Sequence, residues 1–222
     1  MSSEPGLLTA AARGGGALLE GATHVVSALR PAPKPLHPRG TVWAAEIQRT
    51  GGGVVPTGVP WLDEPGTDEA VVRISAAIGF PHGWPDIQGV AIHLPDQDGA
   101  DLLLASTGAG RVTRFMLRLV RPTSRHVTST LMPYKGPRGP VMLAATQVEP
   151  GEYALLRAAG DGPWVGFGRL RLVAQIDEEH SYDPVLRPLP GLENYAWVER
   201  LRAPAYRAAR HDRGETLDDN LT

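Results

Sequence analysis

The chain has 222 residues, of which 42% are apolar, and its 24 acidic and 22 basic side chains give a formal net charge of −2. This length and apolar content suit one domain with a substantial core and short tails. The near-neutral charge excludes a global field that would attract nucleic acid or an anionic membrane. Because cysteine is absent, disulfides, thiolate zinc sites and cysteine nucleophiles are excluded, and a reducing compartment fits.

The first part of the chain favours helix. Residues Leu7 to Leu29 contain helix formers interrupted by the run Gly14 to Gly16, and two short helices are expected because a glycine inside a helix costs about 1 kcal/mol relative to alanine. The segment lacks the basic start of a signal peptide, and no stretch reaches the length of a spanning helix. We therefore predict an N-terminal helical extension over residues 1–30 and a cytoplasmic protein without membrane contact.

A proline-rich segment, Pro31 to Gly40, separates this extension from a region of strands. Its four prolines exclude regular structure and favour an extended path. After it, apolar runs alternate with Gly, Pro and Asp turns, which is typical of strands. About eight short strands with few helices between them predict a closed or nearly closed antiparallel sheet. These strands are Thr41 to Arg49, Ala70 to Ile78, Gly89 to Leu94, Asp101 to Ser106, Arg114 to Val120, Pro140 to Gln147, Tyr153 to Ala159 and Trp164 to Ile176.

A second helical region closes the chain. Residues Leu192 to Arg213 read as helix, with Pro204 dividing it or opening its second half. The predicted fold class is therefore α+β and mostly β. An antiparallel barrel domain with a C-terminal helix spans residues 31–213, and a flexible tail spans 214–222.

The common catalytic signatures are missing from the sequence. It has no GxSxG elbow, Walker loop, HExxH or GxGxxG motif. The seven histidines include no pair at metal-ligand spacing, so a structural zinc site is not expected. The run His126-Val127-Thr128 supplies one half of a two-motif phosphoesterase signature, and a phosphodiester hydrolase stays a minor alternative.

Three segments of the chain together carry a recognisable pattern. They are Lys34-Pro35-Leu36-His37-Pro38-Arg39-Gly40, then Val72-Arg73-Ile74-Ser75 followed by Pro85-Asp86-Ile87-Gln88-Gly89-Val90-Ala91, and finally Arg202-Ala203-Pro204-Ala205-Tyr206 continuing to Arg213. In order and spacing they resemble the haem catalase family. There, a histidine followed by a basic residue and glycine opens a barrel strand, Val-Arg-Phe-Ser and Asp-x-x-Gly-x-Ala strands follow, and an Arg-x-x-x-Tyr helix supplies the axial ligand. The resemblance covers residues 34–119 and 202–213, and the chain is similar in size to the small catalase-like proteins of bacteria.

The resemblance implies a catalase-like barrel with haem b, with Tyr206 as the axial ligand of the iron and His37 as the distal acid/base. A phenol has a pKa near 10, so a cation such as Arg202 would be needed to stabilise the phenolate. Peroxide cleavage needs a group that takes a proton from one oxygen and returns it to the other, which suits histidine. Ser75 would fix the tautomer of that histidine. Cations for the haem propionates fall at Lys34, Arg73 and Arg213.

The chain departs from the family at the distal amide. Where the family has Asn in an Asp-Leu-x-x-x-Asn-Thr strand, this chain has Ser106 within Asp101 to Thr107, and Gln88 replaces an arginine common in the family. A hydroxyl donates a shorter and less directional hydrogen bond than an amide. We therefore predict a catalase-related peroxidase with weak catalase activity at most.

The predicted partners are hydrogen peroxide or an organic peroxide and a small organic reductant, with a possible homo-oligomer and neither nucleic acid nor membrane. The alternative is a barrel of the same fold that has lost its haem and serves as a small-molecule-binding or scaffold protein.

Overall fold

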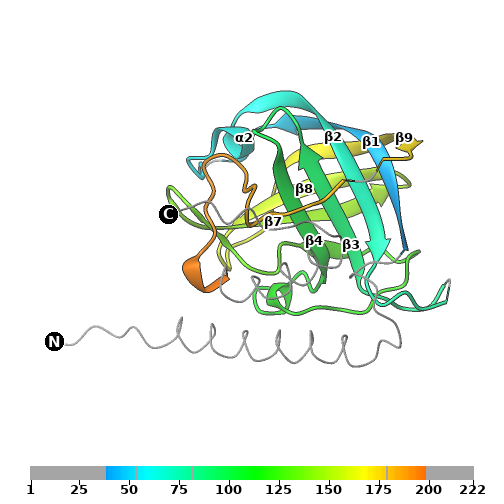
Figure 1. Cartoon of the computed structure of the whole chain (residues 1–222). Coiled ribbons are helices and arrows are strands. Elements are labelled where there is room, and N and C mark those ends of the chain that lie inside the picture. Colours follow the sequence, from blue (N-terminus) through cyan, green and yellow to red (C-terminus); the bar gives the residue numbers. More distant parts are fainter. Residues whose placement is uncertain (1–38, 54, 82, 179, 199–222) are drawn as a thin grey trace, which may run out of the picture. The chain divides into compact units, whose positions relative to one another are not determined.

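The computed structural model describes residues 39–198 except 54, 82 and 179. The predicted N-terminal extension, most of the C-terminal helix and the tail lie outside these described residues. Strands dominate the described part (Figure 1). They are β1 (Arg39–Thr50), β2 (Pro65–Ala76), β3 (Gln88–Leu94), β4 (Ala100–Thr107), β5 (Val127–Ser129), β6 (Tyr134–Gly136), β7 (Gly139–Glu149), β8 (Glu152–Ala159) and β9 (Val165–Ile176), with a short helix α2 (Pro60–Asp63) and a 3-10 turn η1 (Thr113–Phe115).

The strands close into a barrel. The sheet order is β5-β4-β3-β2-β1-β9-β8-β7-β6, and β5 also pairs with β7, which joins the two ends of the sheet. Every pairing is antiparallel. Eight strands therefore form the closed barrel, and β6 pairs with β7 alone. The predicted mostly-β fold with an antiparallel barrel is confirmed.

Apolar side chains fill the interior of the barrel. Val72 of β2, Ile92 of β3, Leu143 of β7 and Leu170 of β9 all belong to one buried cluster. A barrel of about eight strands is just wide enough for side chains to fill it. The interior is therefore a packed core, and a ligand of any size has to bind at an end or on the outer face.

One predicted strand, Arg114 to Val120, is wrong. The residues from Thr113 instead form the 3-10 turn η1, followed by two isolated bridges, one from Leu117 to Thr107 at the end of β4 and one from Val120 to Asp86 in the loop before β3. The cause is Arg114, which is 2% exposed and lies 4.3 Å from the ring centre of Trp164. Its guanidinium also donates to two carbonyl groups of neighbouring loops, which holds the segment across the barrel end. The strand that closes the barrel is β5, which the sequence did not predict.

After β9 the chain turns back along the outer face of the barrel, and we call residues 177–187 the strap. In Figure 1 it passes in front of β3 and β4. The backbone N–H of Asp183 in the strap donates to Asp101 of β4 over 2.7 Å. Within the described part of the chain, no helix is both long enough and apolar enough to span a membrane.

Candidate functional site

The outer face of the first four strands carries four small residues in one cross-strand row. Gly40 of β1 lies opposite Ser75 of β2, Ser75 opposite Gly89 of β3, and Gly89 opposite Ala105 of β4. Successive side chains point to opposite faces of a strand, and Val90 belongs to the core, so this row faces outward. Neighbouring strands lie about 4.8 Å apart, so the row spans about 14 Å with almost no side chains. The strands' own side chains therefore leave the backbone of the row uncovered; Gly40 is exposed, whereas Ser75 and Gly89 are buried.

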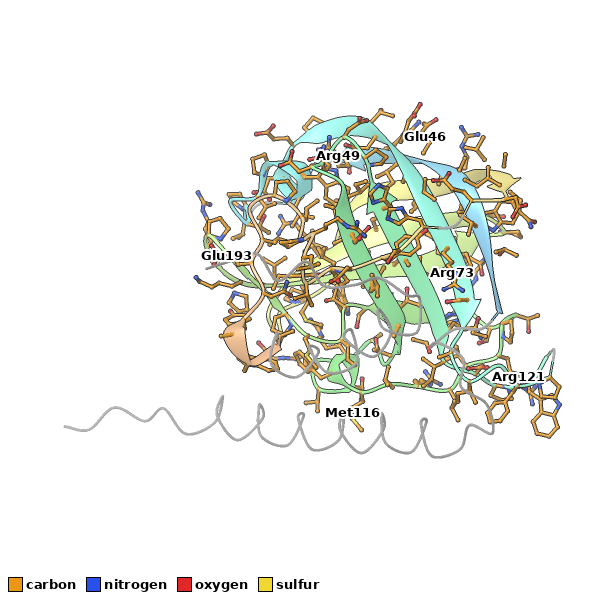
Figure 2. All side chains as sticks on the ribbon, in the orientation of Figure 1. Glu46, Arg49, Arg73, Met116, Arg121 and Glu193 are labelled. Carbon is orange, nitrogen blue, oxygen red and sulfur yellow. The ribbon has the colours of Figure 1, made fainter. Side chains whose placement is uncertain are left out.

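Arg73 lies beside this small-residue row. It precedes Ser75 by two residues on β2 and therefore shares its outer face, as Figure 2 shows for its side chain. A Cβ added to Gly40 would lie 2.8 Å from Nε of Arg73, so the guanidinium packs where only glycine leaves room. Ser75 is buried, with 8% of its surface exposed. The structure thus places two predicted site residues, Arg73 and Ser75, side by side.

Ser106 lies on the opposite face of β4 from the row. It is fully buried, and its Oγ accepts a hydrogen bond from the backbone N–H of Gln88 at 3.1 Å and donates to the carbonyl of Arg118 at 2.6 Å. Its one hydroxyl proton is therefore already engaged within the barrel end. The other predicted site residues lie outside the described residues: Lys34, His37, Arg202, Tyr206 and Arg213.

Asp101 is the centre of a polar cluster between β3, β4 and the strap. Its carboxylate is fully buried. Oδ1 lies 2.9 Å from Nδ1 of His93 and 3.3 Å from Nε2 of His180. Oδ2 accepts from Nε of Arg187 at 2.7 Å and from the N–H of Asp183. A buried carboxylate needs such partners, and here they fasten the strap to the barrel.

Spacing along the chain did not reveal this cluster. His93 and Asp101 are cross-strand neighbours on β3 and β4, which follows from the register of a predicted hairpin. His180 comes 79 residues after Asp101, and only the return path of the strap brings it there. Burial lowers the pKa of His180, and the nearby His93 lowers it further.

Tyr182 connects the strap to the neighbourhood of Arg73. Its ring meets that of His180 edge to face, with centres 4.7 Å apart. Burial raises the pKa of Tyr182 far above its ordinary value, and the Arg73 guanidinium opposes this shift. The hydroxyl is buried and has no hydrogen-bond partner among the described residues. It is therefore a neutral donor close to the outer face.

A small cavity lies at one end of the barrel, with a volume of about 50 Å³. The amide nitrogen of Gln88 is buried there without a described partner. A cavity of this size has room for a few water molecules. Its lining consists of Ile74, Gln88, Gly89, Val90, Pro122, His126, Thr128, Ala145, Gln147 and Tyr153.

The sequence matches no protein-family model and no curated protein, but solved structures share its fold. A fungal catalase superposes with a TM-score of 0.56 at 13% identity, covering 89% of this chain and 62% of the catalase chain. A bacterial catalase gives 0.52 at 12% identity, covering 92% and 63%. This chain therefore spans less than two thirds of the length of these catalases. The class that the comparison defines is a catalase-like β-barrel.

Proposed function

We propose that the protein is a haem-dependent, peroxide-using oxidoreductase of the catalase-related peroxidase type. The observation that carries this proposal is the small-residue row, flanked by Arg73, on the outer face of a barrel whose structural neighbours are catalases. A row of small residues suits a flat macrocycle, because no large side chain of the four strands would stand between the ligand and their backbone. An arginine at its edge suits a carboxylate such as a haem propionate, which it can bind through two parallel hydrogen bonds.

Haem b fits these residues, and when bound it supplies an iron centre for peroxide chemistry. We assign His37 as the residue that takes a proton from one peroxide oxygen and returns it to the other. Arg39 begins β1 opposite Ala76, next to Ser75. His37 precedes Arg39 by two residues, so the two Cα atoms lie within about 7 Å of each other. That reach supports Ser75 as the partner that fixes the imidazole tautomer.

The remaining assignments concern the other side of the macrocycle and its rim. Tyr206 would hold the iron through its phenolate oxygen, and Arg202 would keep that phenol ionised. Lys34 and Arg213 would join Arg73 as cations for the propionates. The resemblance gives Ser106 the position of the family's distal amide, but Ser106 lies on the face of β4 opposite the row and already donates its proton to a carbonyl. Because β4 then presents no amide to orient peroxide on the proposed haem face, we favour slow oxidation of a small organic reductant over rapid catalase turnover.

Expression with ample haem tests the proposal. The wild-type protein is expected to show a Soret band that shifts in Tyr206→Phe, and to oxidise a phenolic dye with hydrogen peroxide. Arg73→Ala is expected to weaken haem binding, whereas Arg169→Ala, at an exposed arginine of β9, serves as the matched control. A protein that stays colourless after haem is added would contradict the proposal.

A second candidate function is a haem-free barrel that binds a small polar molecule. The cavity at the barrel end favours it, because the Gln88 amide offers a buried donor without a described partner. This reading predicts a colourless protein whose melting temperature rises with a small carbonyl-bearing or carboxylate-bearing compound. Gln88→Leu would abolish that rise and leave the fold intact.

A further inference from the structure

Two imidazoles and one carboxylate converge on a single point beneath the strap. Nδ1 of His93, Nε2 of His180 and a carboxylate oxygen of Asp101 all lie within 4.8 Å of one another. The imidazole rings lie with their centres 3.8 Å apart, and both turn a nitrogen toward the same oxygen. We propose that these three side chains form a binding site for a divalent transition-metal ion of the zinc type.

The distances between the ligand atoms suit such an ion. Asp101 Oδ1 lies 2.9 Å from the His93 nitrogen and 3.3 Å from the His180 nitrogen. Zinc bonds of about 2.0–2.1 Å to nitrogen and oxygen place tetrahedral ligand atoms about 3.3 Å apart. Small rotations of the two rings therefore make room for the ion. In the metal-free cluster the two ligand nitrogens face a carboxylate oxygen, which only accepts hydrogen bonds, so each of them carries a proton. When the ion binds, that proton would move to the other nitrogen of the same ring or to solvent.

The second carboxylate oxygen of Asp101 is held by two hydrogen-bond donors, which would form the outer shell of the metal site. Asp101 Oδ2 accepts hydrogen bonds from Nε of Arg187 and from the N–H of Asp183, which fixes the direction of Oδ1. Outer-shell partners of this kind orient metal ligands and raise affinity. Arg187 also balances the buried carboxylate charge before the ion arrives.

The protein supplies three ligands to the site, and solvent can reach two of them. Asp101 is fully buried, but the side chains of His93 and His180 are 15% and 18% exposed. Three protein ligands and an open position for water are the arrangement of an open zinc site, and imidazole nitrogens select zinc-type ions over magnesium. The ion would connect the strap to β3 and β4. The site does not rest on haem, because none of its ligands belongs to the proposed haem pocket.

Metal binding to the haem-free full chain, without a histidine tag, tests the site. Titration calorimetry with zinc chloride is expected to show one tight ion per chain for the wild type and for the control His126→Gln. His180→Gln and His93→Gln are expected to bind at least about 100-fold more weakly, the upper end of what loss of an outer-shell partner alone costs. Cobalt(II) should give an intense visible band of tetrahedral coordination in the first two proteins only.

The melting temperature provides an independent readout of the same site. Because an ion that binds the folded state stabilises it by mass action, zinc should raise the melting temperature of the wild type and of His126→Gln, and leave His180→Gln unchanged. Circular dichroism establishes that each variant is folded. Absence of zinc binding by the wild type, or equal binding by His180→Gln and His126→Gln, would overturn the site.

Discussion

Asp63, the last residue of α2, fixes the loop that follows β1. Its Oδ1 accepts from the N–H and the hydroxyl of Thr57, and its Oδ2 accepts from the N–H of Gly58. Arg157 lies 3.7 Å from the same carboxylate. Burial by itself raises the pKa of Asp63, but these hydrogen bonds and the nearby cation outweigh it, and the pKa lies below its ordinary value of 3.8.

This shift predicts an acid-sensitive contribution to stability. A carboxyl group whose pKa is lower in the folded state stabilises the fold above its unfolded pKa, and this contribution is lost as the pH falls through the folded value. Asp63→Asn is expected to cost about 1–3 kcal/mol at neutral pH and to flatten the loss of stability below pH 4 or so. Urea unfolding at pH 7 and pH 3 measures both effects. Asp96→Asn, at an exposed position, should reproduce the wild-type pH profile.

Gly40 controls the position of Arg73. Because a Cβ there would lie 2.8 Å from the guanidinium and 3.0 Å from the carbonyl of Ile74, Gly40→Ala is expected to displace Arg73 and to weaken haem uptake about tenfold, equivalent to about 1.4 kcal/mol. Gly166→Ala, where the nearest atom is 4.0 Å away, should leave uptake unchanged. Haem titration followed at the Soret band compares the two, and equal affinities would show that Arg73 has no part in binding.

Among the elements, η1 depends on one buried arginine. Arg114 donates to the carbonyls of Gly110 and Gly160, and Arg114→Met removes both of these charge-assisted hydrogen bonds, although the Gly110 carbonyl keeps the backbone N–H of residue 114. We expect a loss of about 1.5–3 kcal/mol in the free energy of unfolding. Arg111→Met removes an exposed ion pair with Asp161 and should change stability by less than about 1 kcal/mol. Denaturant unfolding distinguishes them, and equal losses would contradict this role of Arg114.

The sequence predicted the long strands and missed the short ones for a physical reason. Strands β1 to β4 and β7 to β9 carry apolar runs or alternation that identify them directly. By contrast, β5 is three residues long and contains Thr128 and Ser129, so it has no apolar pattern. The run from Arg114 to Val120 alternates like a strand, but the buried guanidinium fixes it as a turn.

In the candidate sites, too, the sequence predicted what depends on neighbouring residues of one strand and missed what depends on residues far apart in the chain. Arg73 and Ser75 share one face because of strand alternation, which the sequence predicts. The Asp101 cluster depends on His180 and Arg187, which reach it only through the path of the strap. Side chains that far apart in the chain carry no shared local pattern, so sequence reasoning could not bring them together.

At the scale of the whole molecule, the packed barrel core sets stability. Leu170 is fully buried in the central cluster, and Leu170→Ala is expected to cost about 2–5 kcal/mol, because it removes apolar contacts and leaves a cavity. Leu186→Ala, at a position that is 64% exposed, should have little effect. Thermal unfolding of both variants checks this. A small effect of Leu170→Ala would mean that the barrel interior is loosely packed.

The barrel closes at β5, which pairs with both β4 and β7, and we call this closure the seam. Strands β1 and β2 pair over twelve residues, whereas β5 joins each of its neighbours through three pairs. Only a few backbone hydrogen bonds would therefore have to break for the closed barrel to become an open, curled sheet. Local opening costs the least free energy where contacts are fewest. Amide protons of β5 should therefore exchange with solvent well before those of β1, and an opened seam would expose the edges of β4 and β7 to pairing with another chain.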